Sequence, residues 1–285
     1  MKGELDYVYR SVSSDLAPAV DVVWSSDADL VIAFQNGLIE VVDVENRIVK
    51  SKTNFNEPIV GITMCDKNRL VVQSKSGSVS VWTIGEWKCL WSFSVKSAVS
   101  FARPVVMENT VCFVSKGQSV LGFVDLETAQ LITQLDLDSI LNKPPGMIVA
   151  LGISSSCFLA LTEAGQIIKF SSQGKVSGCR QDLVVPRNSV PTALHVSGEV
   201  FVGFSDGSVF NITEGPKSPS AGVGAICSVQ SELVVGLWDG RIQCVPPQTA
   251  AEDQPHIASI RSIAYNSLDR FAVASTDGRV SVWFI

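Results

Sequence analysis

Residues 258–284 read ASIRSIAYNSLDRFAVASTDGRVSVWF. Three short apolar runs are separated by two polar turns, and the second turn ends in Asp277-Gly278. The pair Asp-Gly readily adopts the positive φ angles of a tight hairpin turn. Residues 279–283 then alternate between polar and apolar side chains, as expected for a strand with one buried face. The segment therefore predicts three consecutive antiparallel strands.

The same unit recurs along the whole chain. Its copies span residues 19–44, 58–84, 98–126, 146–172, 190–213, 222–245 and 258–284. Each copy carries a glycine in its second turn, namely Gly37, Gly77, Gly117, Gly165, Gly207, Gly240 and Gly278. Successive glycines lie between 33 residues apart (Gly207 to Gly240) and 48 residues apart (Gly117 to Gly165). This range brackets the roughly 40–45 residues of a WD-type propeller blade.

The repeats predict an all-β fold, a seven-bladed WD40-type β-propeller that forms a single domain over residues 1–285. The expected blades are approximately 19–57, 58–97, 98–145, 146–189, 190–221, 222–257, and 258–285 plus 1–12. The chain reaches only the third strand of the last unit at Trp283, whereas residues 5–10 form a strand-like segment ahead of the first unit. We expect this segment to complete the last blade, so that no sheet edge stays open.

Two blades have weak outer strands in the sequence. Pro216 and Pro219 follow the fifth unit, and Pro246-Pro247 follow the sixth. Proline cannot donate a backbone hydrogen bond and is tolerated mainly at sheet edges. The outer strands of these two blades are therefore expected to be short or absent.

One apolar stretch, residues 147–161 (MIVALGISSSCFLAL), could be mistaken for a membrane span. It is shorter than the roughly 18–20 residues that a helix needs to cross the hydrocarbon core. Ser154-Ser155-Ser156 divides it into two runs of strand length, which predicts two buried strands. The best helical candidate, residues 136–142, is stopped by Pro144-Pro145.

The composition limits the classes of function. The formal net charge is −6 and the sequence pI about 5.0, which argues against a phosphate-binding face and against direct nucleic-acid binding. No apolar segment follows Lys2, so neither a secretory signal nor a membrane anchor is expected. The seven cysteines form no CxxC pair, which is typical of a reducing compartment.

The sequence offers little for catalysis. It has two histidines, His195 within an alternating strand and His256 at the place where WD repeats carry a structural histidine. It contains no phosphate-binding GxxxxGK[ST] loop and no His/Cys cluster at metal-binding spacing. The chain is therefore expected not to be an enzyme and to need no cofactor or metal. The interpretation of His256 is structural: a buried hydrogen-bonded tetrad of His256, Ser275, Asp277 and Trp283 that pins the last blade.

The candidate sites are surfaces on one rim of the ring, where the second turn of each unit lies. Trp238, Asp239 and Arg241 surround the sixth turn, and Trp and Arg are enriched at binding hot spots. Phe204 and Asp206 occupy the corresponding turn of the fifth unit. These five residues are the predicted protein-binding candidates. In the alternative interpretation, Trp238 only covers the next blade.

The chain resembles the WD-repeat superfamily over essentially its full length. Within it, the order of features resembles the G-protein β-subunit-like, ASTRA-associated family of small WD-repeat proteins. The stretches that carry this resemblance are residues 70–82, 98–103, 202–209, 236–242 and 275–283, together with a long central blade that has little WD character. Most Gly-His and Trp-Asp dipeptides of ordinary WD repeats are lost.

The resemblance implies a function and partners. It implies a non-catalytic adaptor that works with the Tel2–Tti1–Tti2 co-chaperone in the maturation of phosphatidylinositol-3-kinase-related kinases, with a link to chromatin-remodelling assemblies. It further implies a monomer within a hetero-complex, in cytoplasm and nucleus, without direct nucleic-acid or membrane binding.

Two other functions remain open. The chain could be a propeller subunit of a nuclear-pore, ubiquitin-ligase or chromatin complex. The ubiquitin-ligase receptor is disfavoured because Val42-Asp43-Val44-Glu45 and its equivalents lack a Trp-Asp-x-Arg end. A hydrolase of the diphthine methylesterase type would need a nucleophile and a base that two structural histidines do not readily supply.

Overall fold

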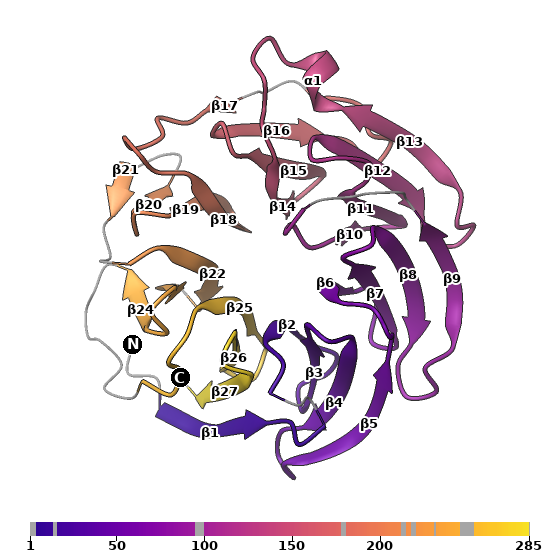
Figure 1. The fold of residues 1–285 in the computed structure, drawn as a ribbon, viewed down its shortest axis with the longest axis vertical. Coiled ribbons are helices and arrows are strands. Elements are labelled where there is room, and N and C mark those ends of the chain that lie inside the picture. The colour runs from indigo at the N-terminus through magenta and orange to yellow at the C-terminus, as the bar shows by residue number, and fades with distance from the viewer. Residues whose placement is uncertain are drawn as a thin grey trace.

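The computed structural model describes residues 4–13, 16–94, 100–177, 181–211, 215–217, 221–230, 232–245 and 254–284. Seven antiparallel sheets surround a central axis in it, like the blades of a propeller (Figure 1). The predicted seven-bladed β-propeller is confirmed. Because tight turns join neighbouring strands, six of the sheets consist of strands that are consecutive in the chain, and the seventh is completed by the N-terminal strand.

The first three blades follow one another along the chain. They consist of β2 (Ala19–Trp24), β3 (Asp29–Phe34), β4 (Leu38–Asp43) and β5 (Ile48–Asn54); β6 (Ile59–Met64), β7 (Arg69–Ser74), β8 (Ser78–Thr83) and β9 (Cys89–Ser94); and β10 (Val105–Met107), β11 (Thr110–Val114), β12 (Val120–Asp125) and β13 (Leu131–Asp136).

The remaining blades complete the ring. They consist of β14 (Ile148–Ser154), β15 (Cys157–Thr162), β16 (Gln166–Phe170) and β17 (Gln181–Asp182); β18 (Pro191–Ser197), β19 (Glu199–Phe204), β20 (Val209–Asn211) and β21 (Gly215–Lys217); β22 (Val223–Val229), β23 (Glu232–Leu237) and β24 (Ile242–Val245); and β25 (Ile260–Tyr265), β26 (Arg270–Ser275), β27 (Arg279–Phe284) and β1 (Glu4–Arg10).

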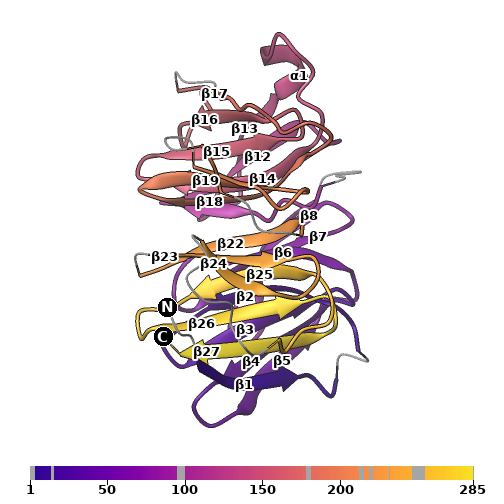
Figure 2. The same ribbon diagram turned by 90° about the vertical axis from the view of Figure 1, so that its left-hand side faces the viewer.

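The last blade is closed as the sequence predicts. β1 pairs with β27 in antiparallel register, from Glu4 opposite Phe284 to Arg10 opposite Arg279. Figure 2 shows β1, β27 and β26 side by side. β1 also reaches the first blade, because the Tyr9 hydroxyl donates a 2.7 Å hydrogen bond to the buried carboxylate of Glu40. The N-terminal strand therefore ties both sides of the ring closure together.

All seven predicted turn glycines have positive φ, from 75° at Gly117 to 95° at Gly37. This conformation is strained for residues with a Cβ atom, which explains why the turns use glycine. At Gly240 space is also limiting, since a Cβ atom there would lie 2.5 Å from the carbonyl oxygen of His256. The same glycines thus shape the hairpins and admit the neighbouring chain.

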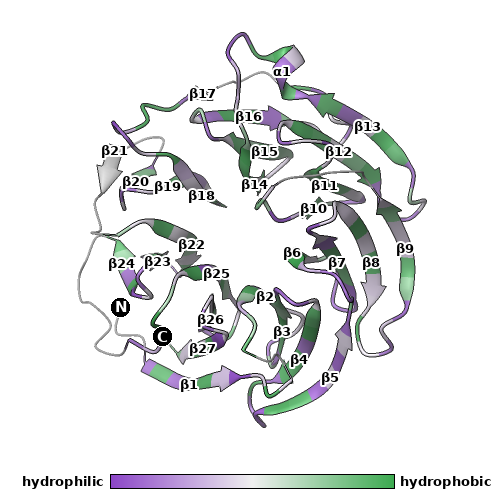
Figure 3. Cartoon of the chain, in the orientation of Figure 1, coloured by the Kyte–Doolittle hydropathy of each residue, from purple (hydrophilic) through white to green (hydrophobic). Residues whose placement is uncertain are grey.

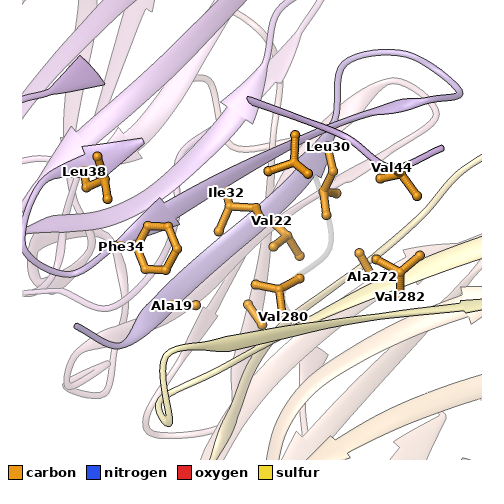
Figure 4. Close-up of a cluster of buried hydrophobic side chains, with 12 residues drawn as sticks. Ala19, Val22, Leu30, Ile32, Phe34, Leu38, Val44, Ala272, Val280 and Val282 are labelled. Atoms are coloured by element: carbon orange, nitrogen blue, oxygen red, sulfur yellow. The ribbon is translucent and has the colours of Figure 1, made fainter. Parts of the chain in front are cut away.

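The core lies between blades. Leu30, Ile32 and Phe34 of β3 extend toward Val280 and Val282 of β27, and all are fully buried (Figure 4). Full burial of such a side chain contributes about 1.5–3 kcal/mol. The outermost strands β1 and β13 mix hydrophobic and hydrophilic residues, and none of their side chains is fully buried (Figure 3). Inter-blade packing is therefore the main source of stability.

The other local expectations have clear outcomes. The apolar stretch of residues 147–161 forms the paired strands β14 and β15, as predicted. The helical candidate shrinks to α1 (Leu137–Ile140), whose first turn is capped by the Asp136 side chain. In the fifth blade the outer strand β21 has three residues, and the sixth blade has three strands among the described residues. Within that described part, no helix is long and apolar enough to cross a membrane.

Candidate functional site

One face of the ring carries most of the irregular chain. Strand direction alternates within a blade, so the turn between the second and third strands lies on the same face as the connection to the next blade. We call this the connection face. In the first blade it carries the turn after β3 and residues 55–58 before β6. The predicted rim residues lie on this face.

Large apolar side chains are exposed on the connection face. The five most exposed ones among the described residues, between 62% and 98% exposed, all lie between two blades: Val12, Leu16, Phe101, Val184 and Ile257. Trp238, in the turn after β23, is 45% exposed on the same face. Exposed apolar groups that gather on one side of a protein mark an interaction surface.

Trp238 is partly exposed, and the strand that it covers belongs to its own blade and not to the next one. Its ring lies so close to Gly222 that a Cβ atom there would be 2.4 Å from the indole. The indole therefore covers the start of its own inner strand β22, while its other side faces solvent. Arg241 forms an ion pair with Asp239 across the same turn, at 2.6 Å. This pair fixes the turn next to the exposed part of Trp238.

The candidates of the fifth blade differ. Phe204 is fully buried and packs edge-to-face on Phe210 at 5.0 Å, so it offers no surface to a partner. Asp206 is exposed, and its carboxylate accepts hydrogen bonds from the backbone N–H and the hydroxyl of Ser208. The sequence pattern placed Phe204 at a turn, but it is the last residue of β19 and points into the core.

The structure brings three of the four tetrad residues together and replaces the fourth. His256 is fully buried, with Nδ1 3.4 Å from the Asp277 carboxylate and Nε2 2.8 Å from the Ser281 hydroxyl. Trp283 Nε1 donates to the same hydroxyl at 2.8 Å. Ser275, expected in this role, donates to the Ala258 carbonyl because the β26 position faces that segment.

The Asp277 carboxylate is the charged member of this network. Desolvation raises its pKa, but hydrogen bonds from His256 and from the backbone N–H groups of Ile257 and Arg279 outweigh this effect and lower the pKa to about 2. An ionised carboxylate held by several donors fits a structural role.

His195 also has structural partners. Its Nε2 accepts a 2.9 Å hydrogen bond from the Ser228 backbone N–H, which joins β18 to β22. Desolvation, with a smaller contribution from the positive charge of Arg103, lowers the pKa of His195 to about 4. The ring is therefore neutral at physiological pH and is engaged in packing two blades.

Two of the described cysteines, Cys65 and Cys227, are weak nucleophiles. Burial raises the pKa of Cys65 to about 12 and that of Cys227 to about 11, so their thiols stay protonated at neutral pH. Over the described ranges, no group of three or more His, Cys, Asp or Glu side chains is placed to hold a metal ion.

A charged cluster that the sequence did not reveal lies in the central channel. Asp21 is buried and accepts hydrogen bonds from the Ser262 hydroxyl at 2.6 Å and from the Arg103 guanidinium at 3.0 Å. The Ile62 backbone N–H binds its other carboxylate oxygen. The Arg103 side chain passes over Gly61, where a Cβ atom would lie 2.4 Å from the Cβ atom of Arg103. Four blades thus meet at one carboxylate.

Above this cluster the channel opens on the connection face into a cavity of about 340 Å³. Phe101, Lys75 and Arg261 line it together with Pro18, Val20, Gln35, Pro58, Ile59, Val60, Ser100 and Thr276. We call this cavity the channel mouth. Among the residues that the structure describes, its lining includes two cationic side chains and no carboxylate.

The position of Arg261 follows from the β-bulge of the inner strands. In six blades the register of the first two strands shifts by one residue at the same place. The extra residues line the channel and are Val20, Val60, Val149, Thr192, Gly224 and Arg261. Arg261 is the only charged residue among these six. An alignment of the inner strands of the repeats would have shown this single charge, and this is the signal by which the sequence could have revealed Arg261.

Comparison with known proteins supports the fold. No family model matches the chain, and no curated protein matches it. Among solved structures it is similar to the crystal structure of the computationally designed Ika8 protein, with a TM-score of 0.73, 17% sequence identity, and coverage of 96% of this chain and 98% of that chain. Identity this low shows a shared fold and no more. The chain is a seven-bladed β-propeller.

Proposed function

We propose that the protein is a non-catalytic adaptor that binds partner proteins through its connection face. One observation carries this proposal: the five most exposed large apolar side chains of the described residues all lie on that face. Burying such side chains contributes about 25 cal/mol per Å² of apolar surface removed from water. The opposite face also has exposed large apolar residues near the strand ends, among them Ile48, Leu268 and Phe284, but none of them is more than 55% exposed.

The roles of the titratable groups support a non-catalytic function. His256 binds Asp277 and Ser281 within the last blade, and His195 binds Ser228 of the neighbouring blade. In each case the hydrogen bonds serve packing between strands. The His-Asp-Ser composition of the last blade thus has a structural use.

The finer proposal concerns the partner. The resemblance to the ASTRA-associated family favours the Tel2–Tti1–Tti2 co-chaperone and, through it, phosphatidylinositol-3-kinase-related kinases, in cytoplasm and nucleus. An adaptor of this kind needs a broad rigid surface, which a closed ring of sheets provides. Subunit roles in nuclear-pore, ubiquitin-ligase or chromatin complexes would use the same face with other partners.

Affinity purification of the full chain, followed by mass spectrometry, tests both levels. We expect Val184→Asp, and separately Trp238→Ala with Arg241→Ala, to weaken capture of the main partner by more than about 1–2 kcal/mol. Leu268→Asp, a comparable change in the turn between β25 and β26 on the opposite face, is the control. Thermal melting of each variant verifies that the fold is retained.

The outcomes separate the two levels. Recovery of Tel2–Tti1–Tti2 subunits that depends on the connection face supports the whole proposal. Face-dependent recovery of a different complex keeps the adaptor and overturns the co-chaperone assignment. Capture that is equally sensitive to Leu268→Asp contradicts the proposed face.

A further inference from the structure

We propose that the channel mouth binds an extended peptide segment of the partner through an acidic side chain, next to an apolar one. This inference rests on the proposed adaptor function and specifies what one part of the connection face recognises.

Arg103 lies deeper in the channel than Arg261. Its guanidinium lies 3.0 Å from the Asp21 carboxylate and 3.2 Å from the Ser262 hydroxyl. Asp21 in turn accepts hydrogen bonds from the backbone N–H groups of Val22 and Ile62. The carboxylate is therefore saturated by internal donors, and the charge of Arg103 is neutralised within the protein.

Arg261 has no carboxylate in the described part of the protein that pairs with it in this way. Among the described residues no carboxylate lies within ion-pair distance of its guanidinium. The guanidinium lies over the ring of Phe101, 6.0 Å from the ring centroid. Desolvation lowers the pKa of Arg261, with Asp21 opposing and Arg103 reinforcing this effect, although part of the side chain is exposed to solvent at the mouth. A carboxylate brought into the mouth would offset this unfavourable environment.

Lys75 supplies a second cation to the same cavity. It lies in the turn after β7, and its backbone N–H donates a 2.7 Å hydrogen bond to the Pro58 carbonyl, which fixes the turn at the mouth. The side chain is exposed, and within the described part of the chain no carboxylate pairs with it. The mouth is thus locally cationic on a protein with a net charge of −6.

The apolar half of the cavity comes from Phe101, whose side chain is 63% exposed. Pro18, Pro58 and Val60 line the same space. An aromatic ring between prolines and a cation suits a peptide that presents an apolar side chain beside a carboxylate. The volume of about 340 Å³ accommodates two such side chains of an extended chain, though no folded domain.

An acidic peptide is favoured over nucleic acid, the other anionic class. A polyphosphate backbone needs many cations along a surface, and the overall negative charge of this protein repels it at long range. A single carboxylate needs only the local charge of the mouth. The ligand class is therefore a short acidic and apolar protein segment.

Fluorescence anisotropy with the full chain tests the proposal. The probe is a short fluorescein-labelled peptide in which glutamates flank one leucine, and the comparison peptides carry glutamine or lysine in place of glutamate. We expect the glutamate peptide to bind and the lysine peptide not to bind. Arg261→Gln should weaken binding about tenfold or more, because it removes a charge-assisted hydrogen bond. Phe101→Ser and Lys75→Gln should weaken it by smaller factors.

Lys67→Gln is the matched control, since Lys67 is exposed in the turn at the other end of the hairpin that carries Lys75. Binding that is unchanged by Arg261→Gln, equal affinity for the glutamine peptide, or displacement of the probe by a single-stranded oligonucleotide would each overturn the proposal. The purification experiment distinguishes this failure from that of the adaptor: capture lost in Val184→Asp but retained in Arg261→Gln keeps the adaptor and rejects the acidic ligand.

Discussion

The second and last blades follow the same pattern but are held together differently. In both, a serine two residues before a tryptophan accepts a hydrogen bond from the indole at 2.8 Å, from Trp82 to Ser80 and from Trp283 to Ser281. In the last blade His256 and Asp277 extend this pair into a buried network.

The second blade has Phe55 and Ser76 at the equivalent positions, four residues before the inner strand and one residue before the turn glycine. Phe55 packs edge-to-face on Trp82, with ring centroids 4.6 Å apart. Ser76 donates to the Glu57 carboxylate at 2.7 Å. A cavity of about 160 Å³ remains between these groups.

The difference between the two blades indicates where a propeller needs side-chain hydrogen bonds in addition to the backbone hydrogen bonds between its strands. The second blade is continuous in sequence, so its chain alone keeps the four strands together. The last blade joins two distant parts of the chain through β1 and β27, and its buried network lies next to this junction. We infer that the network compensates for the missing chain connection.

The largest expected effect comes from removing the junction itself. Deleting residues 1–12 removes β1, exposes the edge of β27 and leaves the buried Glu40 carboxylate without the Tyr9 hydroxyl. We expect a loss of about 4–6 kcal/mol in the free energy of unfolding, measured by urea denaturation. Tyr9→Phe, which removes only the hydrogen bond, should lose about 1–3 kcal/mol. A truncated chain as stable as the full one would show that β1 does not hold the ring.

The next effect compares the blades directly. His256→Ala removes the imidazole hydrogen bonds to Asp277 and Ser281 and leaves a cavity beside these polar groups, and it should cost about 3 kcal/mol. Phe55→Ala at the equivalent position removes a half-buried ring and should cost about 1–2 kcal/mol. Both values come from urea denaturation of single variants. Equal losses would mean that the network adds nothing beyond packing.

Much of the fold follows from local patterns in the chain. Asp277-Gly278 and its equivalents specify tight turns, and the alternation after each turn specifies a strand, so the number of blades and the role of residues 5–10 could be predicted. The sequence specifies the outer strands less clearly, because β21 forms in a segment where Pro216 weakens the propensity for strand. Backbone pairing to β20 overrides that weak propensity.

The candidate site could be predicted only in part. Trp238 is visible in the sequence because it lies beside a recognised turn. Arg103 and Arg261 are 158 residues apart, and the repeat pattern does not say that one bulge position faces the channel. The prediction of Ser275 instead of Ser281 as a member of the network has a similar cause. Both serines face the interior from adjacent strands, and only the three-dimensional geometry shows which of them His256 binds.

The pH dependence of stability gives a smaller effect. The pKa of Asp277 is lowered to about 2 from its ordinary 3.8, so its contribution is complete above about pH 4 and is lost as the pH falls toward 2. Asp277→Asn should flatten the stability curve in this window, measured by thermal melting. Ser76→Ala, its counterpart in the second blade, should change the curve less, because Ser74 and Ser78 also lower the pKa of the Glu57 carboxyl that Ser76 binds. His195 acts in a separate window: its pKa of about 4 lies below the ordinary 6.5, so its contribution is lost as the pH falls from 6.5 to 4.

The smallest expected effect comes from transferring the network into the second blade. Phe55→His and Ser76→Asp introduce the imidazole and the carboxylate that the second blade lacks. Glu57→Ala removes a carboxylate that would repel the new aspartate, and the residue equivalent to Glu57 in the last blade is Ala258. The cavity of about 160 Å³ has room for the imidazole. We expect Phe55→His alone to destabilise the protein and the triple variant to recover about 1 kcal/mol of that loss, read from a thermodynamic cycle of unfolding free energies. Since the second blade has no junction to secure, the triple variant should not exceed the stability of the unmodified chain by more than about 1 kcal/mol. A larger gain would show that the network stabilises any blade equally and that its position beside β1 has no special significance.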